Sequence, residues 1–213
     1  MIYYSPIDGD PKLFKGKDRP RTCFIMTKLG KSVPNEIKNI RRSVKQNLDK
    51  YEINEVDAAS IITGKDFLLK IWNMIVSVPM GIAIINEQMT VNTYSNIFYE
   101  IGMLQAYGRE TLIIKTPSTQ IPSDFVRTEY LNFDDDFDMN FLRYLETVLE
   151  FPEHYKNMSD QLEKNPLLSI DFLKRAYFLS GDSKYRIQAK NIFENAEIGD
   201  RAKNSVEMLL ADF

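Results

Sequence analysis

The chain has 213 residues with 27 basic and 30 acidic side chains, which gives a net charge of −3 at neutral pH. This near balance argues against direct nucleic-acid binding, because phosphate recognition needs a basic surface. The single cysteine, Cys23, excludes an intramolecular disulfide and predicts a reducing, cytoplasmic setting. The single histidine, His154, lies in a polar stretch and is expected at the surface, and His and Cys are too few for the common zinc sites.

The first half of the chain is expected to start as an irregular arm and then to alternate strands and helices. Residues 1–20 are rich in Pro, Gly, Asp and Lys, which favours the arm. Apolar periodicity then predicts a buried strand at 21–27, a helix at 36–51, a strand at 51–59 and a helix at 64–78. The second helix is expected to turn five side chains inward: Phe67, Leu68, Ile71, Trp72 and Ile75.

The middle of the chain continues the same alternation. Apolar runs and periodicity predict a strand at 81–85, a polar loop at 86–93, a helix at 95–107, a strand at 111–116, an edge strand at 129–133 and a helix at 137–151. The longest near-apolar run, 74–85, is too short to span a bilayer and contains Pro79, so no membrane segment is expected.

Strand and helix repeated several times, with strands that are continuous apolar runs, predict a parallel sheet covered by helices on both faces. The expected fold class is therefore α/β, a flavodoxin-like (Rossmannoid) domain over residues 21–151. Residues 152–213 contain no strand-like run and are expected to form an all-helical extension with three helices, 166–181, 183–196 and 201–213. Its aromatic residues at helical spacing are expected to be packing residues: Tyr177, Phe178, Tyr185 and Phe193.

One acid stands inside an apolar stretch, "YSNIFYEIG", at residues 94–102. On a helical wheel, Ile97, Ile101 and Leu104 form the stripe that faces the sheet, and Glu100 lies at the margin of that stripe. The same side of the helix carries Asn96, Met103 and Tyr107. We expect Glu100 in the first turn or two, near the carboxyl ends of the strands, where open α/β sheets bind ligands. The plain alternative is an acid that only suits the helix dipole.

The stretch "NIFYEIGMLQAYGRETLIIKT", followed by "IPSDF", resembles a motif of the nucleoside 2-deoxyribosyltransferases and the related TIR-like nucleotide-binding domains of bacteria. The shared pattern is Asn, an aromatic residue, Glu100, Gly102, a later Gly-Arg before a strand, and a Pro-Ser-Asp step. The upstream "TCFIMTKLG" is similar to the first strand and loop of those domains, so the resemblance covers about residues 21–135. The family carries an Asp at the end of its third strand, where this chain reads "INEQMT" and offers Glu87.

The resemblance implies cleavage or transfer of an N-glycosidic bond in NAD, a nucleoside or another nucleotide, without a required cofactor or metal. Glu100 would be the catalytic carboxylate, with Asn96 beside it, because a carboxylate can stabilise or attack the positive sugar carbon. The residues that would line the substrate crevice are Met26, Thr27, Lys28, Tyr94, Tyr99 and Asp124. Each has a structural alternative as a cap, a packing residue or a solvated side chain.

Two further expectations follow from the resemblance. The protein would act as a cytoplasmic homo-oligomer, with the helical extension promoting self-association, in an antiviral-defence role.

The alternative to an enzyme, which the altered "INEQMT" and "TKLG" elements favour, is a module that senses a nucleotide without cleaving it. A scaffold whose crevice is filled by its own side chains is a third hypothesis.

Overall fold

The computed structural model describes a chain made of two compact units. One unit is Thr22–Glu146, and the other joins Met1–Arg21 to Thr147–Phe213. The described residues are 3–4, 11–12, 18–30, 32–60, 67–125, 128–162 and 164–196, with Lys203, Glu207 and Leu210. Among these residues, no helix has the length and hydropathy needed to cross a membrane.

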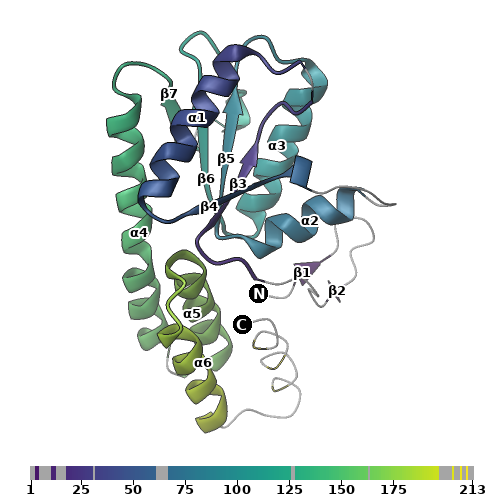
Figure 1. Cartoon of the computed structure of the whole chain (residues 1–213). Helices are drawn as coiled ribbons and strands as arrows, with labels where there is room; N and C mark the ends of the chain where they lie inside the picture. Colours follow the sequence, from purple (N-terminus) through teal and green to yellow (C-terminus); the bar gives the residue numbers. More distant parts are fainter. Residues whose placement is uncertain are drawn as a thin grey trace. The chain divides into compact units, whose positions relative to one another are not determined.

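The first unit is built on a five-stranded sheet in which every pair of strands is parallel (Figure 1). The strands in spatial order are β4 (Asn54–Asp57), β3 (Thr22–Met26), β5 (Met80–Ile85), β6 (Glu110–Lys115) and β7 (Tyr130–Asn132). This is the flavodoxin-like order. The first strand of the sheet, β3, lies in its interior, and the order in which strands are added reverses between β3 and β5. The predicted α/β class is therefore confirmed.

Helices cover both faces of this sheet, as predicted (Figure 1). The helices are α1 (Asn35–Lys50), α2 (Phe67–Ser77), α3 (Val91–Ala106) and the start of α4 (Phe137–Gln161). Side chains of α1 bond to α4, as in Asn47 to Asp138 at 2.7 Å. On α2, the Trp72 indole donates to the Tyr107 hydroxyl just after α3, at 2.6 Å. The helices are therefore joined in two pairs, α1 with α4 and α2 with α3.

The strands form where the sequence is uniformly apolar, because a parallel sheet buries both faces of each strand. All five residues of β3 and all six residues of β5 are buried, including Cys23. Burial raises the pKa of the Cys23 thiol well above its usual range, which leaves it inert as a nucleophile. Gly81 of β5 lets α3 approach closely, because a Cβ at this position would lie 2.4 Å from Leu104 Cδ1.

Two details of the first unit differ from the prediction. Helix α3 begins at Val91, four residues earlier than residue 95, because the Thr90 hydroxyl accepts a hydrogen bond from the Thr93 amide and caps the helix. Leu68 of α2 is exposed, whereas Ile71, Trp72 and Ile75 are buried as predicted. The side chain of Phe67 lies outside the described residues.

The second unit consists of helices and one short antiparallel pair of strands. Its helices are the later part of α4, α5 (Pro166–Ser180) and α6 (Lys184–Asn195). Their core contains Ile170, Leu173, Ala176, Tyr185 and Ala189, with Tyr177 and Phe193 packed against it. In the N-terminal arm, β1 (Tyr3–Tyr4) pairs with β2 (Pro11–Lys12). The arm is fixed to α5 where the Arg21 amide donates to the Phe178 carbonyl at 2.8 Å.

The expected boundary at residue 152 falls inside a continuous helix. Helix α4 runs from Phe137 through Pro152 to Gln161, and the division between the two compact units lies between Glu146 and Thr147. A proline removes one helical hydrogen bond, but Pro152 is buried and the following residues lack a further helix breaker. Of the predicted helix 201–213, Lys203, Glu207 and Leu210 are helical, and the rest lies outside the described residues.

Candidate functional site

The carboxyl ends of β3 and β5 mark the point where strand order changes direction, which is where sheets of this class bind ligands. Three predicted crevice residues follow β3 or end it. Met26 and Thr27 are buried, and the Thr27 hydroxyl donates to the Ile84 carbonyl at 3.0 Å. Lys28 is half-buried. Met26 and Thr27 therefore support the floor of this edge, and Lys28 is the one of the three with a partly open side chain.

A buried amide at the end of β5 forms the centre of a polar group that sequence reasoning missed. The Asn86 side chain is completely buried, and its Nδ2 donates to Glu36 Oε2 in the first turn of α1 at 3.3 Å. The Asn86 carbonyl accepts the hydroxyl of Tyr94 at 2.8 Å. The Asn86 Oδ1 atom has no hydrogen-bond partner among the described residues. A buried acceptor without a donor lowers the stability of the fold by about 1–3 kcal/mol. Such an unsatisfied group is therefore a candidate for a functional role.

The carboxylate of Glu87 is fixed at the same edge. It accepts hydrogen bonds from the hydroxyls of Thr116 at 2.7 Å, Ser118 at 3.1 Å and Thr119 at 3.2 Å. These bonds, the Thr116 bond foremost, lower the pKa of Glu87. The edge between β5 and β6 therefore presents a carboxylate that is ionised at neutral pH, in the place where the resemblance expects an acid.

Glu100 is half-buried and lies deeper along its helix than expected. It is the tenth residue of α3, so it lies about 14 Å along the axis from Val91. The placement in the first turn or two was wrong, because α3 begins earlier, and the helix dipole does not reach so far. Burial raises the pKa of Glu100 to about 7. None of the described residues donates a hydrogen bond to its carboxylate or forms an ion pair with it.

The predicted apolar stripe of α3 beside Glu100 is buried. Ile97, Ile101 and Leu104 are buried, and Glu100 lies at the margin of that stripe. Asn96 and Tyr99 are exposed on the same helix, and Asn96 is a helix-interior residue rather than a cap. Asn96 precedes Glu100 by one helical turn, so the two share a side of α3.

The two remaining predicted residues lie near the turn after β6. Tyr94 stacks on Phe98 with ring centroids 6.0 Å apart, and Phe98 contacts Phe125 at 4.6 Å. Asp124 is exposed in the short helical turn Ser123–Phe125. The structure therefore places Tyr94 beside Asn86 at the sheet edge, with its ring in an aromatic stack, and turns Asp124 towards solvent.

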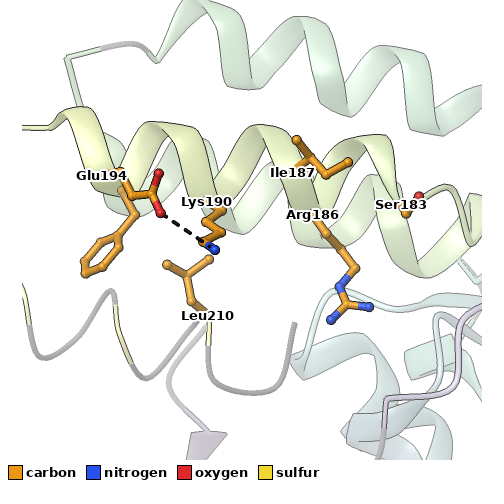
Figure 2. Close-up of a pocket in the computed structure, with 7 residues that line it drawn as sticks. Ser183, Arg186, Ile187, Lys190, Glu194 and Leu210 are labelled. Atoms are coloured by element: carbon orange, nitrogen blue, oxygen red, sulfur yellow. Dashed lines mark ion pairs between the residues drawn. The ribbon is translucent and has the colours of Figure 1, made fainter.

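The helical unit has a groove of about 540 Å³ along the outer face of α6 (Figure 2). Basic and apolar side chains alternate along it, and the groove is bordered by Leu210. The residues of α6 that line it, with the preceding cap residue, are Ser183, Arg186, Ile187, Lys190, Phe193 and Glu194.

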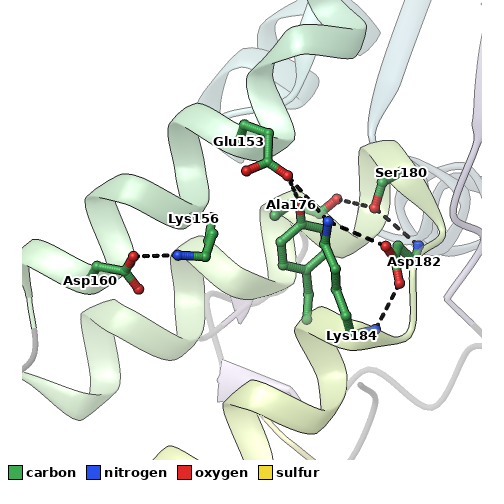
Figure 3. A network of polar contacts seen from close by, with 8 residues as sticks. Glu153, Lys156, Asp160, Ala176, Ser180, Asp182 and Lys184 are labelled. Atoms are coloured by element: carbon green, nitrogen blue, oxygen red, sulfur yellow. Dashed lines mark hydrogen bonds and ion pairs between the residues drawn. The ribbon is translucent and has the colours of Figure 1, made fainter.

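A polar network joins α4 to α6 on another side of this unit (Figure 3). Glu153 Oε1 accepts from Lys184 Nζ at 3.2 Å and from the Tyr185 hydroxyl at 3.0 Å. These donors lower the pKa of Glu153, Lys184 first. The network therefore fixes the start of α6 on α4. His154, next in sequence, is exposed as predicted.

The described residues contain no group of three or more His, Cys, Asp or Glu side chains arranged to hold a metal ion. No protein-family model, curated protein or solved structure matches this chain.

Proposed function

We propose that this protein cleaves or transfers the N-glycosidic bond of a nucleotide, such as NAD or a nucleoside, with Glu100 as the catalytic carboxylate. The observation that carries the proposal is the state of Glu100: half-buried, without a hydrogen-bond or ion-pair partner among the described residues, and with its pKa raised to about 7. A carboxyl group that is kept in such surroundings without a partner is typical of a group retained for chemistry.

The chemistry suits a single carboxylate. When the bond between C1′ and the base breaks, the electron pair leaves with the base and positive charge develops on the sugar. Ionised Glu100 can stabilise that charge or attack C1′, and water or an acceptor hydroxyl then takes the sugar. Nicotinamide leaves NAD as a neutral molecule, so this step needs no proton. A nucleoside base leaves more easily when protonated, and the raised pKa of Glu100, about 7, lets this carboxyl carry a proton nearer to neutral pH than an ordinary glutamate does.

The sheet edge offers groups that would bind the remainder of such a substrate. The fixed Glu87 carboxylate is exposed and can accept a sugar hydroxyl, whereas the buried Asn86 amide holds Glu36 in place behind it. Lys28 is the cation that would meet a phosphate, and Asn96 and Tyr99 flank Glu100. The resemblance adds that the protein acts in the cytoplasm as a homo-oligomer in antiviral defence.

The direct test compares wild type with Glu100→Gln, which keeps the shape of the side chain and removes its charge. Each protein is incubated with NAD and a panel of nucleosides, and released base is measured by chromatography. Asp135→Asn, which changes an exposed acid, is the matched control. We expect base release by wild type and Asp135→Asn and at least about a hundredfold loss for Glu100→Gln. Equal rates for all three remove Glu100 from the mechanism.

A second function, nucleotide sensing without cleavage, is favoured by one observation. Glu100 lies in the third turn of α3, whereas Asn86, Glu87 and Tyr94 gather at the sheet edge. A ligand held at that edge alone would be bound and not cleaved. In this case nucleotide raises the melting temperature of wild type and of Glu100→Gln equally, and the ligand is recovered intact.

A further inference from the structure

A second cavity of the helical unit lies between three helices. Its volume is about 550 Å³, which is the size of pockets that hold small organic molecules, and such pockets are common between the helices of a bundle. The cavity is bordered by the end of α4, the start of α5 and the later half of α6. Its polar lining consists of Ser159, Asp160, Ser169, Gln188, Asn191 and Asn195.

Two buried serines close the base of this cavity. Ser159 of α4 and Ser169 of α5 are each 1% exposed, and their hydroxyls are 2.7 Å apart. The Ser169 hydroxyl also donates to the Ser159 carbonyl at 3.1 Å, so the proton between the two hydroxyls belongs to Ser159. These bonds join α4 to α5 behind the cavity, and the walls are therefore held in place before any ligand arrives.

Three amide side chains follow one side of α6. Gln188, Asn191 and Asn195 are three and four residues apart, so they form a row about 10 Å long. The amide nitrogen of Gln188 donates to Asp160 Oδ1 at 3.3 Å, and that of Asn195 donates to the Asn191 carbonyl at 2.8 Å. Because carboxylates and carbonyls only accept, these bonds leave the amide oxygens of Gln188 and Asn195 as acceptors without a donor among the described residues.

The charges around the cavity favour a cation over an anion. Asp160 lines it, and no basic side chain does in the described part of the chain. The Asp160 carboxylate accepts from Lys156 one turn earlier on α4, but it keeps lone pairs for a ligand, and such i,i+4 pairs at a surface are weak. Helices α4 and α6 both end at the cavity, and the C-terminal end of a helix dipole is negative.

The start of α5 offers little to an anion, although helix N-termini often bind one. Pro166 is the first residue of α5 and has no N–H group. The N–H group of Leu168 already donates to the side chain of Asn165, and that of Ser169 donates to the Asn165 carbonyl. The cavity is therefore rich in acceptors and poor in donors.

We propose that this cavity binds an elongated aliphatic cation with several N–H donors, of the alkylguanidine or polyamine class. One charged end meets the Asp160 carboxylate and the Gln188 amide oxygen, and a guanidinium suits a carboxylate because two parallel N–H groups can donate to it. The methylene chain packs against Ile192, which is half-buried and lines the cavity. The donor at the other end reaches the Asn195 amide oxygen. This inference goes beyond the proposed function and uses no residue of the sheet.

The first test titrates the full chain with agmatine and with spermidine at low salt, by calorimetry. We expect a dissociation constant below about a millimolar for at least one of them. Asp160→Asn should weaken binding at least about tenfold, because the charge-assisted contact is lost. Glu150→Gln removes an exposed acid from the same helix and should leave the affinity unchanged. In NMR spectra, the side-chain amide signals of Gln188 and Asn195 should shift on binding, and hexanediol, which is linear and uncharged, should not shift them.

The second test adds charge instead of removing it. The Asn191 side-chain amide is exposed and has no partner among the described residues, so Asn191→Asp changes the cavity without breaking a contact. A second carboxylate in the row should tighten agmatine binding about fivefold. This variant keeps the proposal testable if Asp160→Asn fails to fold.

Three results overturn the proposal. The first is a wild-type chain that shows no saturable binding of either cation up to about ten millimolar, which is expected if the chain's own residues fill the cavity. The second is an affinity that neither Asp160→Asn nor Asn191→Asp alters. The third is hexanediol that shifts the same amide signals as agmatine does. Base release from NAD in the Glu100→Gln experiment is unaffected by any of them, so the two proposals fail separately.

Discussion

The hydroxyl of Thr116 donates a 2.7 Å hydrogen bond to the carboxylate of Glu87, which links the residue after β6 to the residue that follows Asn86 at the end of β5. Thr116 is buried, whereas the rest of the Glu87 side chain faces solvent. A buried hydroxyl that directs an exposed acid gives this edge of the sheet a fixed negative charge in a defined position.

Thr116→Val tests that link, because valine has the same shape and no hydroxyl. We expect the pKa of Glu87 to rise towards its ordinary value of 4.5, since its first-ranked donor is lost. Because the pKa of Glu87 is lower in the folded protein than in the unfolded chain, its ionised form stabilises the fold at pH values above 4.5. This stabilisation is lost as the pH falls through the folded-state pKa. The variant should therefore lose stability at neutral pH and lose less than wild type on acidification. Carboxyl chemical shifts followed by NMR measure the pKa, and an unchanged Glu87 titration would contradict the assignment.

For Glu100→Gln we expect the opposite dependence of stability on pH. The folded-state pKa of Glu100 is raised from 4.5 to about 7, so the fold binds its proton more tightly than the unfolded chain does. Wild type should therefore lose stability as the pH rises from about 4.5 through about 7, by at most about 3 kcal/mol. The glutamine variant lacks this loss and should be the more stable protein at pH about 8.5. Urea unfolding at pH about 5 and about 8.5 measures the difference, and parallel pH dependence of the two proteins would count against a buried Glu100.

Two glycines are predicted to behave differently on substitution by alanine. Gly81→Ala places a methyl group 2.4 Å from Leu104 Cδ1 and 3.0 Å from Met26 Cε, and both neighbours are buried. We expect a loss of about 1–3 kcal/mol in the free energy of unfolding. Gly102 lies inside α3, and a Cβ added there would meet no atom within 4 Å, so Gly102→Ala should stabilise the helix by about 1 kcal/mol. Thermal unfolding of the two variants ranks them, and an equal effect would refute the close approach of α3 to β5.

The Gly102→Ala variant also distinguishes a role of this glycine in folding from a role in function. It belongs to the motif that resembles the deoxyribosyltransferases, yet the structure gives it no packing role. A Gly102→Ala protein that is stable and releases no base would indicate that the substrate or a partner needs the open space there. A stable and fully active variant would show that the glycine serves neither purpose.

Tyr185→Phe tests the network between α4 and α6. The Tyr185 hydroxyl donates to Glu153, while the ring is buried in the helical core. Removing the hydroxyl keeps the packing and should cost about 1 kcal/mol. The pKa of Glu153 should rise only in part, because Lys184 remains as its main donor. Chemical denaturation and a carboxyl titration measure the two effects, and a loss as large as that of a core truncation would mean that the ring had moved.

The sheet could be predicted because its strands are continuous apolar runs, and 21–27, 81–85 and 111–116 each coincide with an observed strand within one residue. The start of α3 could not be predicted from the sequence, because Asn92 and Thr93 are typical of loops and the cap at Thr90 depends on a single side-chain hydrogen bond. That one error placed Glu100 in the first turns of the helix instead of the third.

The polar contacts of the sheet edge were beyond sequence reasoning for a different reason. Asn86 and Glu36 are 50 residues apart, and Glu87 and Thr116 are 29 apart. No periodicity or local spacing links such pairs, because the topology of the sheet alone brings them together. A search of residues that immediately follow the predicted strand 81–85 would have found Asn86 and Glu87, and Thr116 is the last residue of the predicted strand 111–116, but Glu36 would have been missed.

The contact between Trp72 and Tyr107 gives this protein a built-in optical probe. The chain has one tryptophan, and its buried indole donates to a hydroxyl seven residues beyond Glu100, on the same side of α3. Indole emission responds to the loss of such a hydrogen bond and to the entry of water. A ligand that breaks this contact between α2 and the end of α3 would therefore produce a red shift in fluorescence, with no dye attached.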